Sequence, residues 1–68
     1  MLQNFTRLKG LLIYRRCTRL VDDAHHKPHT REAAHAYILR SIKWALAHNQ
    51  KTLAERLSGY SLRIAEMS

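Results

Sequence analysis

The sequence predicts an all-α protein, a small three-helix domain built on an antiparallel αα-hairpin. Apolar residues recur at spacings of three and four along most of the chain, which is the period of an amphipathic helix. Thr30 and Thr52 stand where helix N-caps are expected, and only Asn49-Gln50-Lys51 separates the last two apolar stripes. We expect the helices near residues 11–24, 31–48 and 52–67.

The chain is short, apolar enough to fold and strongly basic. It has 68 residues, 46% of them hydrophobic, and 12 Lys and Arg against 5 Asp and Glu give a net charge of +7. One small domain, 1–68, seldom supplies more than about 3–5 kcal/mol from its core. Because Cys17 is the single cysteine, no internal disulfide can help. We therefore expect self-association, most simply as a homodimer.

The first helix has two apolar stripes that do not align. The N-terminal stripe contains Phe5, Leu8 and Leu12. A second stripe on another face contains Ile13, Cys17, Leu20, Val21 and Ala24. The change falls near Gly10, and glycine costs about 1 kcal/mol relative to alanine inside a helix. We expect a frayed lead-in over 1–9, and a helix from about 11.

Positive charge is concentrated in this same segment. Residues 1–20 contain no acid, and Arg15, Arg16 and Arg19 gather away from the second stripe. This triplet is either a solvated helix face or a basic patch for phosphates or for acidic protein groups. An arginine-rich, acid-poor start is also typical of a mitochondrial transit peptide, although serine is absent from it. We keep mitochondrial targeting as the minor alternative and expect a cytoplasmic protein, since a small secreted chain would carry disulfides.

Residues 22–30 read as a polar, histidine-rich linker. Pro28 disfavours helical geometry in the residue before it, and Thr30 can cap the helix that follows. The histidines of this stretch raise the question of a metal site. Structural zinc sites usually draw Cys or His pairs from two separated segments, whereas here the Cys pairs are missing and His25, His26 and His29 lie in one stretch. We therefore expect no metal and no cofactor.

The second helix has one stripe for the hairpin and a different aromatic face. The stripe comprises Ala34, Ile38, Ile42 and Ala45, with Leu39 and Leu46 beside it; His35 should be a hydrogen-bonded residue at its edge. Tyr37 and Trp44 lie two turns apart on another side, with Arg40 and His48 along the same flank. Aromatic residues flanked by cations are typical of protein interfaces. This ridge is either covered by the first helix or is an intermolecular contact.

The third helix begins with a Thr52–Glu55 capping box. Its seam contains Leu53, Leu57, Tyr60, Ile64 and Met67, while Leu62 falls outside the seam and is a further interface candidate. Residues 53–61 resemble the start of a helix-turn-helix DNA reader, in which glycine follows the second leucine directly. Here Ser58 stands between Leu57 and Gly59, so we expect one continuous helix.

The sequence predicts a binding protein and not an enzyme. It has no glycine-rich phosphate loop, no HExxH pair and no nucleophile elbow. We expect a small regulator that docks on another protein as an inhibitor, antirepressor or adaptor would, a type common among phage and mobile-element proteins. The alternative is sequence-tolerant nucleic-acid binding by the basic first helix. No apolar run is long enough to span a bilayer.

Overall fold

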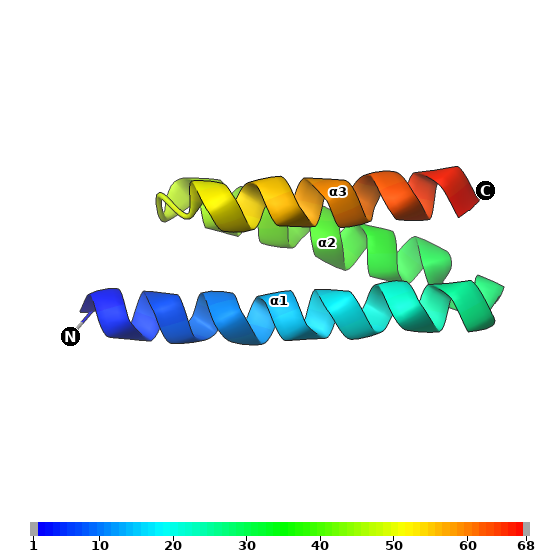
Figure 1. Ribbon diagram of the computed structural model, residues 1–68, viewed down its shortest axis with the longest axis horizontal. Helices are drawn as coiled ribbons and strands as arrows, with labels where there is room; N and C mark the ends of the chain where they lie inside the picture. The colour runs from blue at the N-terminus through cyan, green and yellow to red at the C-terminus, as the bar shows by residue number, and fades with distance from the viewer. Residues whose placement is uncertain (1, 68) are drawn as a thin grey trace.

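Three long helices lie side by side in the computed structural model, which describes residues 2–67 and, within them, the side chains of residues 5–67. They are α1 (Leu2–His26), α2 (Arg31–Ala47) and α3 (Lys51–Met67), with a short 3-10 turn, η1 (Pro28–Thr30), before α2. The chain reverses at each connection, so α2 is antiparallel to both α1 and α3 (Figure 1). The predicted all-α fold and its helical hairpin are confirmed.

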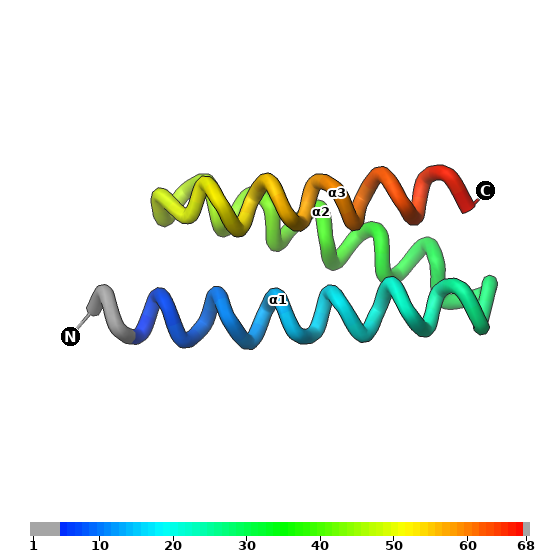
Figure 2. The backbone as a smooth tube through the Cα atoms, in the orientation of Figure 1, coloured from blue at the N-terminus to red at the C-terminus, as the bar shows by residue number. Residues whose placement is uncertain are grey.

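The first helix is longer than the sequence indicated at both ends. The molecule measures 39 × 15 × 14 Å, and at about 1.5 Å per residue the 25 residues of α1 span almost all of its length (Figure 2). The break expected near residue 10 is absent, because Gly10 is buried where α1 crosses the hairpin. A Cβ at this position would lie 3.3 Å from Leu53 Cδ2 and 3.9 Å from Trp44 Cζ3. Glycine therefore permits a close helix approach here instead of ending the helix.

The expected linker over 22–30 is mostly helical. Polar residues continue α1 to His26, and the helix ends only at Lys27, whose φ of −129° and ψ of 85° suit a residue that precedes proline. The expected Thr30 side-chain cap is wrong. The Thr30 hydroxyl donates instead to the Lys27 carbonyl at 2.7 Å, within the η1 turn.

The α2–α3 turn is a Schellman motif centred on Asn49. Asn49 has a φ of 58°, a left-handed conformation that asparagine tolerates better than most residues. The Gln50 amide donates to the Ala45 carbonyl at 2.7 Å, and the Asn49 amide donates to the Leu46 carbonyl at 3.3 Å. These bonds satisfy carbonyls that the end of α2 would otherwise leave free. They also bring the chain into α3 at Lys51.

The expected Thr52 capping box is therefore wrong. Thr52 is the second residue of α3, and it is exposed. The Ala54 amide already bonds to the Gln50 carbonyl at 2.9 Å, so helical hydrogen bonding begins before Thr52. Gly59 does not interrupt α3, and a Cβ added there would contact nothing within 4 Å. The continuous third helix is confirmed, in place of a helix-turn-helix.

The core lies along the line where the three helices meet. It contains residues from the second predicted stripe of α1 and from the predicted stripes of α2 and α3, and its buried members are Ile13, Cys17, Val21, Ala34, Ile38, Leu57 and Ile64. Expected and observed packing differ for Leu39 and Leu46, which are exposed instead of facing α3. The one hydrophilic side chain buried with the described core is Ser41, whose hydroxyl donates to the Tyr37 carbonyl at 2.8 Å.

Arg31 links the C-terminal ends of α1 and α3, which lie at the same end of the bundle. Its Nε donates to the Ala24 carbonyl at 3.2 Å, and its Nη1 donates to the Met67 carbonyl at 2.9 Å. A cation at helix C-termini also opposes the negative end of the helix dipole. The first residue of α2 thus holds the last turns of α1 and α3. None of the described helices has the length and apolarity needed to cross a membrane.

Candidate docking surface on the first helix

The predicted aromatic ridge of α2 lies against α1. Tyr37 and Trp44 are half-buried and pack against the core. The Arg16 guanidinium carbon lies 5.0 Å from the centroid of the Tyr37 ring, and Lys9 Nζ lies 5.2 Å from that of Trp44. His48 stacks on Trp44 with 4.5 Å between ring centroids. Coverage by the first helix, one of the two alternatives for this ridge, is therefore what the structure shows, and these aromatic faces already carry cations from α1.

A second aromatic seam, between α1 and α3, was not recognised in the sequence. Tyr14 and Tyr60 stack with 5.7 Å between ring centroids, and the Tyr60 hydroxyl donates to the Tyr14 hydroxyl at 3.1 Å. Thr18 Oγ1 lies 2.9 Å from the Tyr60 hydroxyl. Arg56 and Arg63 lie over Tyr14 and Tyr60, at 5.6 and 5.8 Å from the ring centroids. The tyrosines are 46 residues apart, so only the pairing of α1 with α3 brings them together.

This tyrosine pair favours the protonated phenol of Tyr14. The hydrogen bond with Tyr60 raises the pKa of Tyr14 above its ordinary value of 10.0. The electrostatic interaction with Tyr60 and partial desolvation raise it further. The Arg56 charge and the Thr18 hydroxyl act in the opposite direction.

Of the other interface candidates, His48 lies against Trp44, and Leu62 lies on a different helix. Arg40 and His48 are exposed, and Leu62 is exposed on α3 while the ridge packs against α1. The structure therefore does not gather the five candidates from the sequence into one surface. Their role in binding stays a prediction.

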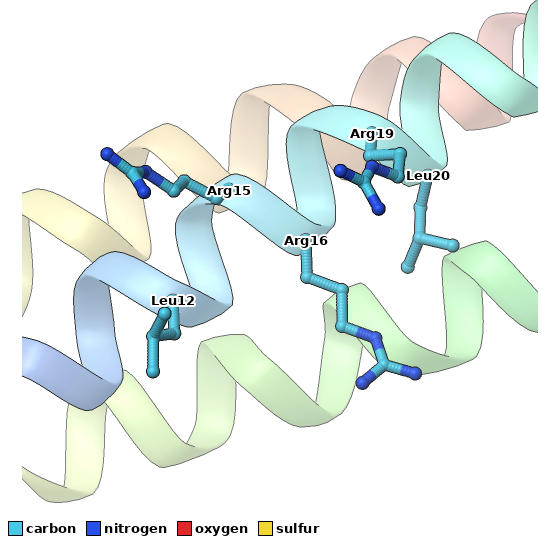
Figure 3. A pocket seen from close by; sticks show the side chains of 5 residues that line it. All are labelled: Leu12, Arg15, Arg16, Arg19 and Leu20. Atoms are coloured by element: carbon cyan, nitrogen blue, oxygen red, sulfur yellow. The ribbon is translucent and has the colours of Figure 1, made fainter.

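The basic patch lies on the outer side of α1 around a shallow depression. Leu12 and Leu20 line this depression together with Arg15, Arg16 and Arg19, and its volume is about 440 Å³. In Figure 3 the Arg16 side chain reaches towards α2, while Arg15 and Arg19 extend away from it. Within the described part of the chain, no carboxylate or other group pairs with the guanidinium of Arg15 or Arg19. Two of the three arginines are thus available to a partner.

The N-terminal half of the same face is apolar and open to solvent. Phe5, Leu8 and Leu12 are 65%, 56% and 55% exposed. The sequence had placed these three residues on one face without indicating whether the hairpin would cover it. The hairpin covers the opposite side of α1, where Ile13 and Cys17 lie. We define the outer face of α1 as Phe5, Leu8, Leu12, Arg15 and Arg19.

The groups that could have supplied chemistry are otherwise engaged. Cys17 is fully buried, and this desolvation raises the pKa of its thiol despite a hydrogen bond with Ser41 and the charge of Arg16. His35 Nε2 lies 2.8 Å from Ser61 Oγ, which confirms the hydrogen-bonded edge histidine. The described His, Cys, Asp and Glu side chains form no group of three that could hold a metal ion.

Comparisons with known protein families, with curated proteins and with solved structures find no match to this chain. The argument for function therefore depends on the surface of the molecule. On the outer face of α1, exposed apolar side chains and unpaired charge occur together. Large exposed apolar groups beside free cations are typical of a surface that another molecule covers.

Proposed function

We propose that this chain is a small helical regulatory protein that acts by docking on another protein, as an inhibitor, antirepressor or adaptor. The observation that carries the proposal is the outer face of α1, where exposed Phe5, Leu8 and Leu12 precede the unpaired Arg15 and Arg19. Burial of apolar surface supplies affinity, and complementary charge supplies orientation and association rate. The partner surface should accordingly be apolar in one part and acidic in the next.

Nucleic acid is the second candidate, and the charge distribution favours it. The net charge is +7, and no acid precedes Asp22. Phosphate binding would use the arginines, but it gives no reason for an adjacent apolar patch on the same helix face. Protein docking accounts for both halves of the face, so we place it first.

A binding role accounts for the chain better than catalysis does. The one thiol is buried with a raised pKa, which keeps it protonated and a poor nucleophile. The depression beside the arginines is shallow and holds no carboxylate or histidine. We propose that the protein acts in the cytoplasm, because a secreted chain of this size would normally contain several disulfides and this one has a single cysteine.

Affinity capture from source lysate, with and without nuclease, tests this function. Two double variants, Leu8→Ser/Leu12→Ser and Arg15→Gln/Arg19→Gln, remove the two halves of the face. Lys43→Gln/Lys51→Gln removes the same charge from exposed positions of the hairpin and is the matched control. We expect a nuclease-resistant protein partner whose recovery falls about tenfold with either outer-face variant and little with the control. Capture that disappears with nuclease would transfer the assignment to nucleic acid.

Self-association also remains a proposal, since a domain of this size has a small core. Leu39, Leu46 and Leu62 are exposed on the hairpin and are candidates for a contact between two copies. Sedimentation equilibrium at high micromolar concentration should show a dimer, and Leu39→Ser/Leu46→Ser should weaken it. A monomer at that concentration would contradict the proposal.

A further inference from the structure

The outer face of α1 has the spacing of a coiled-coil seam. Its members follow one another at intervals of three, four, three and four residues, from Phe5 through Leu8, Leu12 and Arg15 to Arg19. This alternation places side chains in line along one side of a helix, ready to meet a second helix. All five side chains are exposed within one uninterrupted helix. The seam is therefore continuous and uncovered.

The chemistry of the seam changes along its length. Its first three positions are Phe and Leu, and its next two are Arg. We propose that the docking partner presents an amphipathic helix with apolar residues opposite Phe5, Leu8 and Leu12 and carboxylates opposite Arg15 and Arg19. This inference rests on the proposed protein-docking function and names its binding element. The helix would complete a four-helix assembly around α1, opposite the side that α2 and α3 cover.

A second copy of the chain fits this seam poorly. A parallel pair would set Arg15 against Arg15 and Arg19 against Arg19. An antiparallel pair over the full seam would set Phe5 against Arg19 and Leu8 against Arg15, so that Leu12 alone would face an apolar group. A shorter antiparallel overlap centred on Leu8 would bring two acid-free segments together, with Arg7 and Lys9 from both. Charge complementarity thus selects an acidic partner helix.

A peptide with the stated chemistry can test the seam. The probe is a synthetic helical peptide of about three heptads with glutamate at the seam positions of its N-terminal half and leucine at those of its C-terminal half. Acids near a helix N-terminus suit the helix dipole, and this order matches α1 in an antiparallel arrangement. Binding to the full chain is measured by fluorescence anisotropy of the labelled peptide.

Charge exchange is the decisive measurement. Arg15→Glu/Arg19→Glu should weaken binding of the glutamate peptide about tenfold or more, and a peptide with lysine in place of glutamate should restore it. Leu8→Ser/Leu12→Ser should weaken both pairings by a similar factor. The control Lys43→Glu/Lys51→Glu changes the net charge equally on the hairpin and should have little effect. Equal losses with the control, or no recovery with the lysine peptide, would overturn the seam.

Other occupants of the face give different results. Vesicles of equal parts phosphatidylserine and phosphatidylcholine are the second probe. The inference would be overturned if the chain bound these vesicles more tightly than it binds the peptide, and if Leu8→Ser/Leu12→Ser abolished the binding to vesicles. Dissociation of a dimer by that same variant would overturn it too. If a nuclease-resistant partner is still captured through this face while the peptide fails to bind, the inference fails and the docking function stands. If neither the partner nor the peptide binds, both fail.

Discussion

Both sides of α1 have apolar side chains, but the hairpin covers only one of the two sides. Ile13 and Cys17 are buried against the hairpin, while Leu12, adjacent to Ile13 in the chain, is more than half exposed. The inner side contains the small residues Gly10 and Ala24, which let the other helices come close. The outer side has large apolar groups with nothing against them. The spacing of apolar residues shows which faces of a helix are apolar, and the tertiary structure shows which of these faces another helix already covers.

The largest effect should come from a matched pair across this difference. Ile13→Ala should lower the free energy of unfolding by about 2–4 kcal/mol, because it removes buried methyl groups and leaves a cavity. Leu12→Ala, one position away on the outer face, should change it by less than about 0.5 kcal/mol. Urea denaturation followed by circular dichroism measures both. Similar losses at both positions would mean that the outer face is covered in solution.

Trp44→Ala should cost about 2 kcal/mol of stability, less than a fully buried tryptophan would, because the ring is only half-buried. The change removes the contacts of the ring with Lys9 and His48. Lys9→Gln keeps the ring and should cost no more than about 1 kcal/mol. If Trp44→Ala leaves thermal and urea unfolding unchanged, the ridge does not hold α1 to α2.

Tyr60→Phe should cost about 0.5–1 kcal/mol, because it removes the hydroxyl shared by Tyr14 and Thr18 while it keeps the ring stack. The pKa of Tyr14 should fall back towards 10.0, since the hydrogen bond that raises it most is lost. In the native chain the raised pKa stabilises the fold below the ordinary tyrosine value, and this contribution is lost as pH rises through the folded value. Tyrosinate absorbance against pH measures the shift; an unchanged titration of Tyr14 would contradict the seam.

The smallest effect should come from Thr52→Ala, at less than about 0.5 kcal/mol. A residue that caps a helix would cost about 1 kcal/mol when replaced by alanine, but Thr52 is exposed inside the first turn of α3. Thermal unfolding distinguishes the two values. A loss near 1 kcal/mol would show that the helix begins at Thr52 after all.

By itself the sequence determined the number of helices, the hairpin and most of the core. Ile38, Leu57 and Ile64 are buried as their spacing predicted, and Cys17 is a buried residue of the first helix. These properties are local: the period of apolar residues along one helix already defines the face that can be buried. The exposed Arg15 and Arg19 were found for the same reason, since charged residues away from a stripe lie on the open side.

Only the tertiary structure decided the length of α1, the partners of the aromatic rings and the side of α1 that stays open. Gly10 continues the helix because Leu53 and Trp44 lie against it, and Tyr14 meets Tyr60 because α1 lies beside α3. Leu39 and Leu46 are exposed because α3 packs against one face of α2 and α1 packs against a second face, and neither face includes these two leucines. Each outcome depends on residues far apart in the chain. The pattern along one helix shows which faces are apolar, but the way the helices pack together decides which of them are buried.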